Sequence, residues 1–335
     1  MIPVPSASTL STADDELTAR AAWLHYAGGL KQSEVAERLG IAPTRAHRLI
    51  ASAVRNGLVR VFVDCDVASC LTLEQRLYER YGLDLCEVVP DVGENPALPL
   101  HALGRGGGRW LMRVLESSAH PVIGVGHGRT LAAVVDALPR SGSASRQGPA
   151  ACGAARTWVS LLGGLTRKFA ANPYDVVFRV TEKVGADAYF MPAPMFVDSP
   201  EDRALMLGQT GLAEIMQRID SASLCLLGIG ATEPNESLAL GTPDDDGRIQ
   251  AELHALGVVA ELLGQFLDAD GALVATRWDL RMMAPTLATL AGREVVAVAG
   301  GLHKRTAIRA ALRSGHLTGL ITDEATAQAI VDSEP

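Results

Sequence analysis

The most constraining feature of the sequence is a series of three short helical patterns followed by a strand pattern, between residues 15 and 64. Apolar residues recur at helical spacing over 15–28, 32–39 and 43–55. Gly40 follows the second pattern, where a left-handed residue commonly ends a helix. Two short helices joined by a Gly-containing turn predict a helix-turn-helix, whose second helix must stay free to enter a DNA major groove.

The residues after the third helical pattern alternate between apolar and polar. Val59, Val61 and Val63 share one face of the expected strand, which would form the wing of a winged helix-turn-helix. We therefore expect a DNA-binding domain over residues 15–64. The small and polar residues 1–14 are expected to be disordered.

The charge of this region differs from that of the whole chain. Residues 17–63 carry seven Lys and Arg against two Glu, a local net charge of +5, whereas the chain as a whole carries −8. A winged module can also serve only to dock other proteins, but the local charge favours double-stranded DNA. The start of the second motif helix contacts base edges, and the start of the preceding helix lies near phosphate. The expected DNA contacts are Lys31, Gln32, Thr44, Arg45, His47 and Arg48.

The chain is long enough for a second domain over residues 65–335. There it repeats one theme, in which an apolar strand pattern is followed by glycines and then by a helical stretch. This alternation predicts an α/β fold with a mostly parallel sheet covered on both faces. The strand patterns lie at 121–126, 158–162, 224–227, 294–299 and 317–321.

Several classes of protein are excluded by composition. The five cysteines show neither a C-x-x-C pair nor a zinc spacing, which indicates a reduced protein without a metal site. The first 16 residues contain no Lys or Arg and no apolar segment of the kind a signal peptide needs. No apolar run approaches the ~18 residues of a membrane span. We expect a cytoplasmic protein that does not contact the membrane and needs no cofactor.

Glycines follow four of the strand patterns. The first turn, GVGHGRT at 124–130, lies between a strand and a helix, where backbone N–H groups can approach an anion at the helix N-terminus. It is neither a Walker A loop nor a complete G-x-G-x-x-G, and on its own strand-to-helix packing explains it equally well. Because the carboxyl ends of parallel strands meet in one crevice, four such turns favour a ligand site. Its expected residues are Gly126, His127, Gly128, Arg129, Thr130, Gly163, Gly164, Gly228 and Gly230.

Two charged residues complete the predicted ligand site. Lys304 follows the last glycine turn, Gly300-Gly301, and can supply a cation to an anionic group. Asp268 lies in LLGQFLDADG, where its carboxylate can accept hydrogen bonds from sugar hydroxyls. The neighbouring Asp270-Gly271 is more typical of an ordinary turn.

Seven motifs stand in one order along the chain: YAGGLKQSEVA (26–36), GLVRV (57–61), GVGHGRTL (124–131), MPAP (191–194), LLGQFLDADG (262–271), AVAGGLHKRTAI (297–308) and LITDEATA (320–327). In this order they resemble the SorC-type bacterial transcriptional regulators, over residues 15–332. The chain departs from the family at Ala42-Pro43, where Ser-Arg is usual, and at His127, where an aromatic residue is frequent.

The resemblance implies a Rossmann-like effector domain related to sugar-phosphate isomerases and glucosamine-phosphate deaminases. It further implies a sugar, polyol or sugar-phosphate effector, and a homo-oligomer (a dimer or a tetramer) on palindromic operators. His127, together with AAWLHYAGGL and SLLGGLTRKFAANP, resembles the branch that controls polyol catabolism, such as the erythritol regulators.

Together these observations predict a repressor of a carbohydrate or polyol operon, whose operator binding responds to the effector. The alternative is a sugar-phosphate isomerase or deaminase with a DNA-binding head. Related deaminases place a catalytic His soon after the corresponding glycines, whereas this chain reads GIGATEPNESLALG and offers no positioned acid–base pair. We therefore do not expect an enzyme. A docking module without a ligand is a third possibility, disfavoured by the clustered glycine turns.

Overall fold

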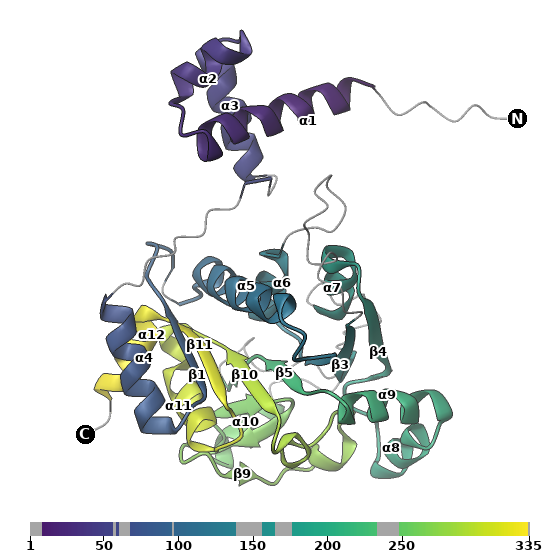
Figure 1. Ribbon diagram of the computed structural model, residues 1–335. Coiled ribbons are helices and arrows are strands. Elements are labelled where there is room, and N and C mark those ends of the chain that lie inside the picture. Colours follow the sequence, from purple (N-terminus) through teal and green to yellow (C-terminus); the bar gives the residue numbers. More distant parts are fainter. Residues whose placement is uncertain are drawn as a thin grey trace, which may run out of the picture. The chain divides into compact units, whose positions relative to one another are not determined.

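The computed structural model divides into two compact units, Met1–Cys65 and Asp66–Pro335 (Figure 1). The structure describes residues 9–55, 58–59, 68–95, 97–138, 156–164, 176–232 and 248–333.

The first unit is a bundle of three helices. The helix α1 (Thr9–Ala22) continues into one π-helical turn, η1 (Trp23–Ala27), and is followed by α2 (Gln32–Leu39) and α3 (Pro43–Arg55). Because α1 begins at Thr9, the prediction of disorder is wrong for residues 9–14. Extending an existing helix needs no new nucleus, so even small polar residues can join it.

A small apolar core holds the three helices together. Ala21 of α1, Val35 of α2 and Ile50 of α3 are all buried in it. Gly40 ends α2 with φ +64°, the left-handed conformation expected there. The predicted wing strand lies almost entirely outside the described residues.

The second unit is built on a seven-stranded sheet in which all pairs are parallel. The predicted α/β fold with a mostly parallel sheet is confirmed. The order across the sheet is β1-β11-β10-β5-β2-β3-β4. The strands are β1 (Leu85–Val89), β2 (Val122–Val125), β3 (Thr157–Gly164), β4 (Asp187–Pro194), β5 (Leu224–Leu227), β10 (Glu294–Val298) and β11 (Gly319–Asp323).

Helices cover both faces of this sheet and give it two separate cores (Figure 1). Successive side chains of a strand point to opposite faces, so Val296 and Val298 pack in one core and Val295 and Ala297 in the other. The first core lies under α5 (Leu100–Glu116), α6 (Arg129–Asp136) and α7 (Val176–Val184). The second lies under α4 (Ala68–Tyr81), α9 (Thr210–Asp220), α11 (Arg305–Arg313) and α12 (Glu324–Asp332).

A small antiparallel sheet follows directly after β5, and the sequence patterns did not reveal it. Its order is β6-β7-β8-β9, with strands β6 (Gly230–Ala231), β7 (Ala260–Leu262), β8 (Gln265–Leu267) and β9 (Leu273–Val274). The remaining helices are α8 (Pro200–Leu207), α10 (Arg248–Ala255), η4 (Asp279–Arg281), η5 (Leu287–Leu290) and η6 (Leu302–Lys304).

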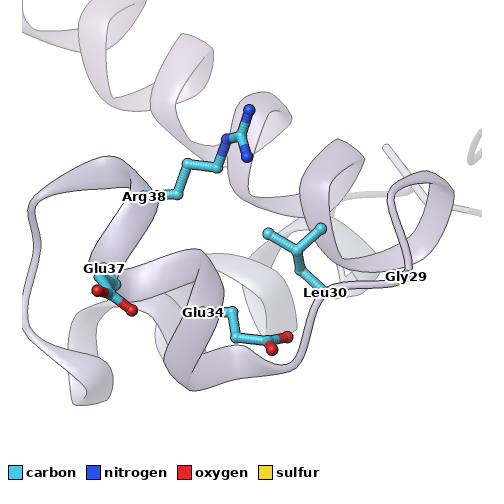
Figure 2. Close-up of a pocket in the computed structure, with 5 residues that line it drawn as sticks. All are labelled: Gly29, Leu30, Glu34, Glu37 and Arg38. Atoms are coloured by element: carbon cyan, nitrogen blue, oxygen red, sulfur yellow. The ribbon is translucent and has the colours of Figure 1, made fainter.

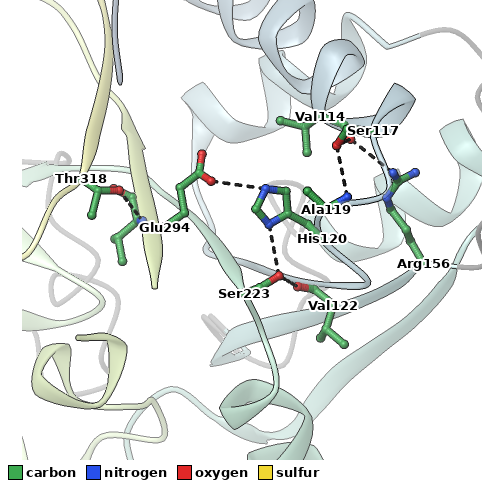
Figure 3. A network of polar contacts seen from close by, with 10 residues as sticks. Val114, Ser117, Ala119, His120, Val122, Arg156, Ser223, Glu294 and Thr318 are labelled. Carbon is green, nitrogen blue, oxygen red and sulfur yellow. Dashed lines mark hydrogen bonds and ion pairs between the residues drawn. The ribbon is translucent and has the colours of Figure 1, made fainter. Parts of the chain in front are cut away.

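The amino ends of the central strands are joined by a polar network (Figure 3). Nδ1 of His120, two residues before β2, lies 3.1 Å from Oγ of Ser223, just before β5. Nε2 of the same ring lies 3.3 Å from Oε2 of Glu294, the first residue of β10. Nearby, Arg156 donates to the carbonyl of Leu115 in the last turn of α5, at 2.7 Å. The fold's own side chains thus occupy this end of the sheet.

None of the helices in the described part of the chain combines the length and apolar character that a membrane crossing requires. Within the same residues, no three His, Cys, Asp or Glu side chains gather in a way that could hold a metal ion.

Candidate functional site

The predicted DNA-reading residues lie on the exposed face of α3. Thr44, Arg45, His47 and Arg48 are all exposed, whereas Ala46 between them is fully buried. The buried positions hold α3 against the other two helices, so the exposed side chains share the outer face. Lys31 and Gln32 at the start of α2 are exposed as well.

Arg45 has a partner within its own unit. Its Nη2 lies 3.0 Å from Oδ1 of Asp14 in α1, and both side chains are about half exposed or more. An exposed ion pair of this kind is weak. Arg45 can therefore exchange Asp14 for another partner at little cost.

A surface pocket of about 560 Å³ lies on another face of the first unit (Figure 2). It is formed by the turn Gly29-Leu30 and by three side chains of α2. Two of these are Glu34 and Glu37, against one Arg38. Its two carboxylates repel phosphate, so the pocket itself is unsuited to the DNA backbone.

In the second unit, the strands that follow β2 and those that follow β5 lie toward opposite edges of the sheet, and their helices cover opposite faces. From β2 the strands progress outward through β3 and β4, with α6 and α7 on one face. From β5 they progress the other way through β10 and β11, with α11 on the opposite face. Ligands of open parallel sheets bind at such a switch point, outside the carboxyl ends of the strands. By this rule the ligand crevice is expected between the turns 126–128 and 228–230.

Two glycines of these turns are not required by the fold. A Cβ on Gly126 would approach no atom more closely than 3.5 Å, and on Gly228 its nearest neighbour would be the His127 carbonyl oxygen at 3.6 Å. Neither has a positive φ. Since backbone and packing both allow a side chain, close approach of a ligand remains a physical reason for glycine at both positions.

The other predicted glycines have a structural explanation. Gly128 has φ +126°, a conformation that side chains rarely adopt. A Cβ on Gly163 would collide with the Pro194 carbonyl, and one on Gly230 with the Glu261 carboxylate. Gly164 pairs with β4, and its carbonyl accepts from Met195 N at 3.0 Å. These glycines shape the strand ends and are not in themselves evidence of a ligand.

The predicted ligand residue His127 is anchored on β3. It is 5% exposed, and its Nε2 lies 3.0 Å from Oγ of Ser160. The Ser160 hydroxyl has one hydrogen, which it donates to the carbonyl of Leu162 at 2.8 Å. The Nε2–H of His127 is therefore the donor to Ser160. This bond holds the glycine turn in place.

The N-terminus of α6 differs from those of two other helices at the same edge of the sheet. Carboxylates cap α5 and α12: Glu94 accepts from His101 N and Ala102 N, and Asp323 accepts from Thr326 N. The N-cap residue of α6 is Gly128, which has no side chain of its own to cap the helix. Its first N–H groups are thus suited to an anion.

Lys304 is brought to the crevice from η6, on the far side of β5. It is 8% exposed, and its Nζ donates to the carbonyl of Ile229 at 3.0 Å. The preceding turn is fixed because Gly301 N donates to Oδ2 of Asp323 at 3.0 Å. The structure therefore places a buried cation beside the 228–230 turn.

Glu261 is a site residue that the sequence analysis missed. It is 2% exposed, its Oε1 accepts from Gly264 N at 2.7 Å, and its other carboxylate oxygen lies against Gly230. The available signal was a single carboxylate inside the apolar run VVAELL (258–263). A buried carboxylate is costly unless it has hydrogen-bond partners or a counter-charge.

Asp268, a predicted ligand residue, has a structural role in its own turn. Its Oδ1 accepts from Asp270 N at 3.0 Å and from Ala272 N at 2.9 Å, which makes it the organising side chain of the β8–β9 turn. Gly271 of this turn packs against Ala310 and Ser314 at the end of α11. Because α11 starts at the carboxyl edge of the sheet and runs back along it, that end is remote from the crevice.

Comparisons with known proteins agree with this architecture. The family described as "Putative sugar-binding domain" matches residues 65–332. The erythritol catabolism regulatory protein EryD of Brucella abortus is 45% identical over 96% of this chain and 98% of its own length. The transcriptional regulator LsrR of Klebsiella pneumoniae is 30% identical over 96% and 94%.

Solved structures show the same fold. The full-length sorbitol operon regulator SorC from Klebsiella pneumoniae superposes with a TM-score of 0.70 at 24% identity, covering 97% of this chain and all of its own. A probable sor operon regulator from Shigella flexneri gives 0.65 at 25% identity, over 78% and 99%. These relatives carry the names of regulators and not of enzymes. The chain belongs to the SorC-type family of transcriptional regulators with a sugar-binding domain.

Proposed function

We propose that this protein binds operator DNA through α3 and releases it when a short polyol, or its phosphate, occupies the crevice between β2 and β5. The observation that carries the proposal is the pair Gly126 and Gly228. They lie on adjacent turns at the switch point, and the fold gives no reason for glycine at either. A repressor of this kind works in the cytoplasm, on the chromosome.

The effector class follows from the crevice and from the relative's name. EryD is named for erythritol catabolism, and erythritol has four carbons. The buried Glu261 carboxylate can accept hydrogen bonds from ligand hydroxyls. Lys304 and the start of α6, which has glycine at its N-cap and is followed by Arg129 and Thr130, suit a phosphate. Both the free and the phosphorylated tetritol are therefore tested.

The DNA partner follows from the exposed face of α3 and the local charge of +5. We propose that two copies of the chain act together on a palindromic operator, because paired half-sites match the two-fold symmetry of a dimer. A tetramer would engage two such operators.

The test is operator release by defined ligands. Full-length protein is bound to a fluorescent duplex from the promoter of its own operon, and erythritol, erythritol 4-phosphate and longer polyols are titrated in. We expect one four-carbon ligand to lower operator affinity at least about fivefold, the low end of typical coupling between sites. Binding of the promoter no tighter than of a scrambled duplex refutes the DNA assignment. Specific binding that no polyol or polyol phosphate changes refutes the effector assignment.

A further inference from the structure

The turn between β7 and β8 holds a leucine in a conformation that leucine rarely adopts. Leu263 has φ +48° and is the only non-glycine residue with a positive φ among those the structure describes. Gly264 follows with φ +71°. Two-residue hairpins of this kind strongly prefer Asn-Gly or Asp-Gly, because a branched side chain is crowded in the left-handed region. The chain thus retains an unfavourable residue at this position.

The side chain of Leu263 is directed into the unit and reaches the Gly126 turn, beside the expected crevice. Leu263 is 3% exposed, and its Cδ2 lies 3.8 Å from the position that a Cβ on Gly126 would occupy. The turn between β7 and β8 is held in place, because Gly264 N donates to Glu261 and Gly264 packs tightly against Met282. An isobutyl group is therefore fixed beside the 126–128 turn.

We propose that Leu263 sets the length of the ligand by closing the crevice at the Gly126 turn. This inference rests on the proposed function. An apolar side chain offers no hydrogen bond, so each further CHOH group placed against it buries an unpaired hydroxyl. Longer polyols are therefore rejected both by volume and by polarity. Leu263 acts as a specificity-determining residue.

A purely structural role for Leu263 makes a different prediction. Leu263 belongs to the same hydrophobic core as Leu262, which is fully buried and has no positive φ. If both residues only fill the core, their truncation lowers stability and leaves the choice of ligand unchanged. Leu262→Ala is therefore the matched control for Leu263→Ala, since both variants lose the same atoms from neighbouring positions.

The experiment measures operator release by full-length protein with erythritol, ribitol, sorbitol and their terminal phosphates. We expect the wild type to respond best to a four-carbon ligand. In Leu263→Ala, the half-effective concentration of the matching five-carbon ligand falls at least about tenfold relative to the four-carbon one, the low end of the effect of one carbon unit in a pocket. Leu263→Gly guards against loss of folding, because glycine adopts φ +48° without strain.

If the wild type responds to polyols, three outcomes overturn the inference. One is a wild type that prefers five or six carbons, and another is an unchanged preference in both Leu263 variants. The third is an equal change of preference in Leu262→Ala. A wild type that binds its operator specifically but responds to no polyol or polyol phosphate overturns the proposed effector class. It then also overturns the proposal that Leu263 sets the length of the ligand. A wild-type response with unchanged variants overturns only the role of Leu263.

Discussion

At Gly126 and Gly228 the folded chain leaves room for a methyl group. In the proposed complex that methyl group would occupy space that the ligand needs. We expect Gly126→Ala and Gly228→Ala to keep their thermal unfolding midpoint, because no atom lies closer than 3.5 Å to the new Cβ. The half-effective ligand concentration should rise by about tenfold or more, as when an extra methyl overfills a packed site. Gly163→Ala is the opposite control, because its Cβ collides with Pro194 and should lower the midpoint. A fully responsive Gly126→Ala would contradict the site.

The three cysteines among the described residues should be unreactive in the folded protein. Cys70 and Cys225 are buried and Cys86 is half-buried. Burial raises the pKa of Cys70 to about 11. Burial raises the pKa of Cys86 to about 12 and that of Cys225 to about 11, the latter despite the nearby Arg293. At pH 8 the thiolate is then about one part in a thousand or less. With Cys65 and Cys152 replaced by Ser, we expect Ellman's reagent to react only after denaturant is added. Rapid labelling of the native protein would show that the second unit opens readily.

His316 should make the second unit sensitive to mild acid. Burial lowers the pKa of His316 in the folded chain from its ordinary value near 6.5. Below that value the unfolded chain binds a proton more readily than the folded one, so the free energy of unfolding falls as the pH drops. We expect a shallower decrease between pH 7 and 5 in His316→Asn, measured by urea unfolding. Equal slopes for the two proteins would contradict this.

At the scale of single elements, we expect operator affinity to depend on the basic side chains of α3 and on the acidic residue that pairs with one of them. Arg48→Ala is expected to lose about 1–3 kcal/mol of operator binding if Arg48 contacts a base, or about one unit of the salt slope if it contacts phosphate.

Asp14→Asn should strengthen binding a few-fold at low salt, because it removes the partner of Arg45. Glu37→Gln, on the pocket face of α2, is the charge-matched control for Asp14→Asn. An equal gain from both would indicate a general charge effect.

The elements that the sequence predicted are those with strong periodicity. The strands before the glycine turns are mostly apolar runs bounded by glycines, and the helices α6, α7, α11 and α12 follow four of them as expected. By contrast, β4 reads DAYFMPAP, in which prolines and exposed residues hide an edge strand. The strands of the small sheet have two or three residues, which is too few to establish a period.

The glycine turns of the proposed site could be located from the sequence because glycines and strand ends carry a signal, whereas its carboxylates carry none. Asp268 and Glu261 both follow apolar residues, and spacing does not reveal which one the fold turns toward the crevice. Asp268 satisfies two backbone N–H groups of its own turn, whereas Glu261 lies against Gly230. That choice depends on the register of β7 and β8, which is a tertiary property.

At the scale of the whole molecule, operator and effector must affect one another equally. If the effector weakens operator binding by a given factor, saturating operator must weaken effector binding by the same factor. We expect calorimetric titration of the effector to show this with and without the duplex. Unequal factors under identical salt would mean that a further state, such as a change in oligomer size, takes part in the cycle.

The pairing of β1 with β11 joins one end of the second unit's sequence to the other, since Leu85 lies opposite Gly319. In a growing polypeptide, β1 therefore leaves the ribosome long before its partner has been made. The helices of the first unit need only local contacts and can form at once, so a head able to bind DNA would emerge ahead of the sensor that controls it. Premature termination before residue 319 would leave β1 without its partner and β10 as an exposed edge, which favours aggregation and degradation. Because the last strand is made so late, the second unit can fold and respond to its effector only after nearly the whole chain has been translated.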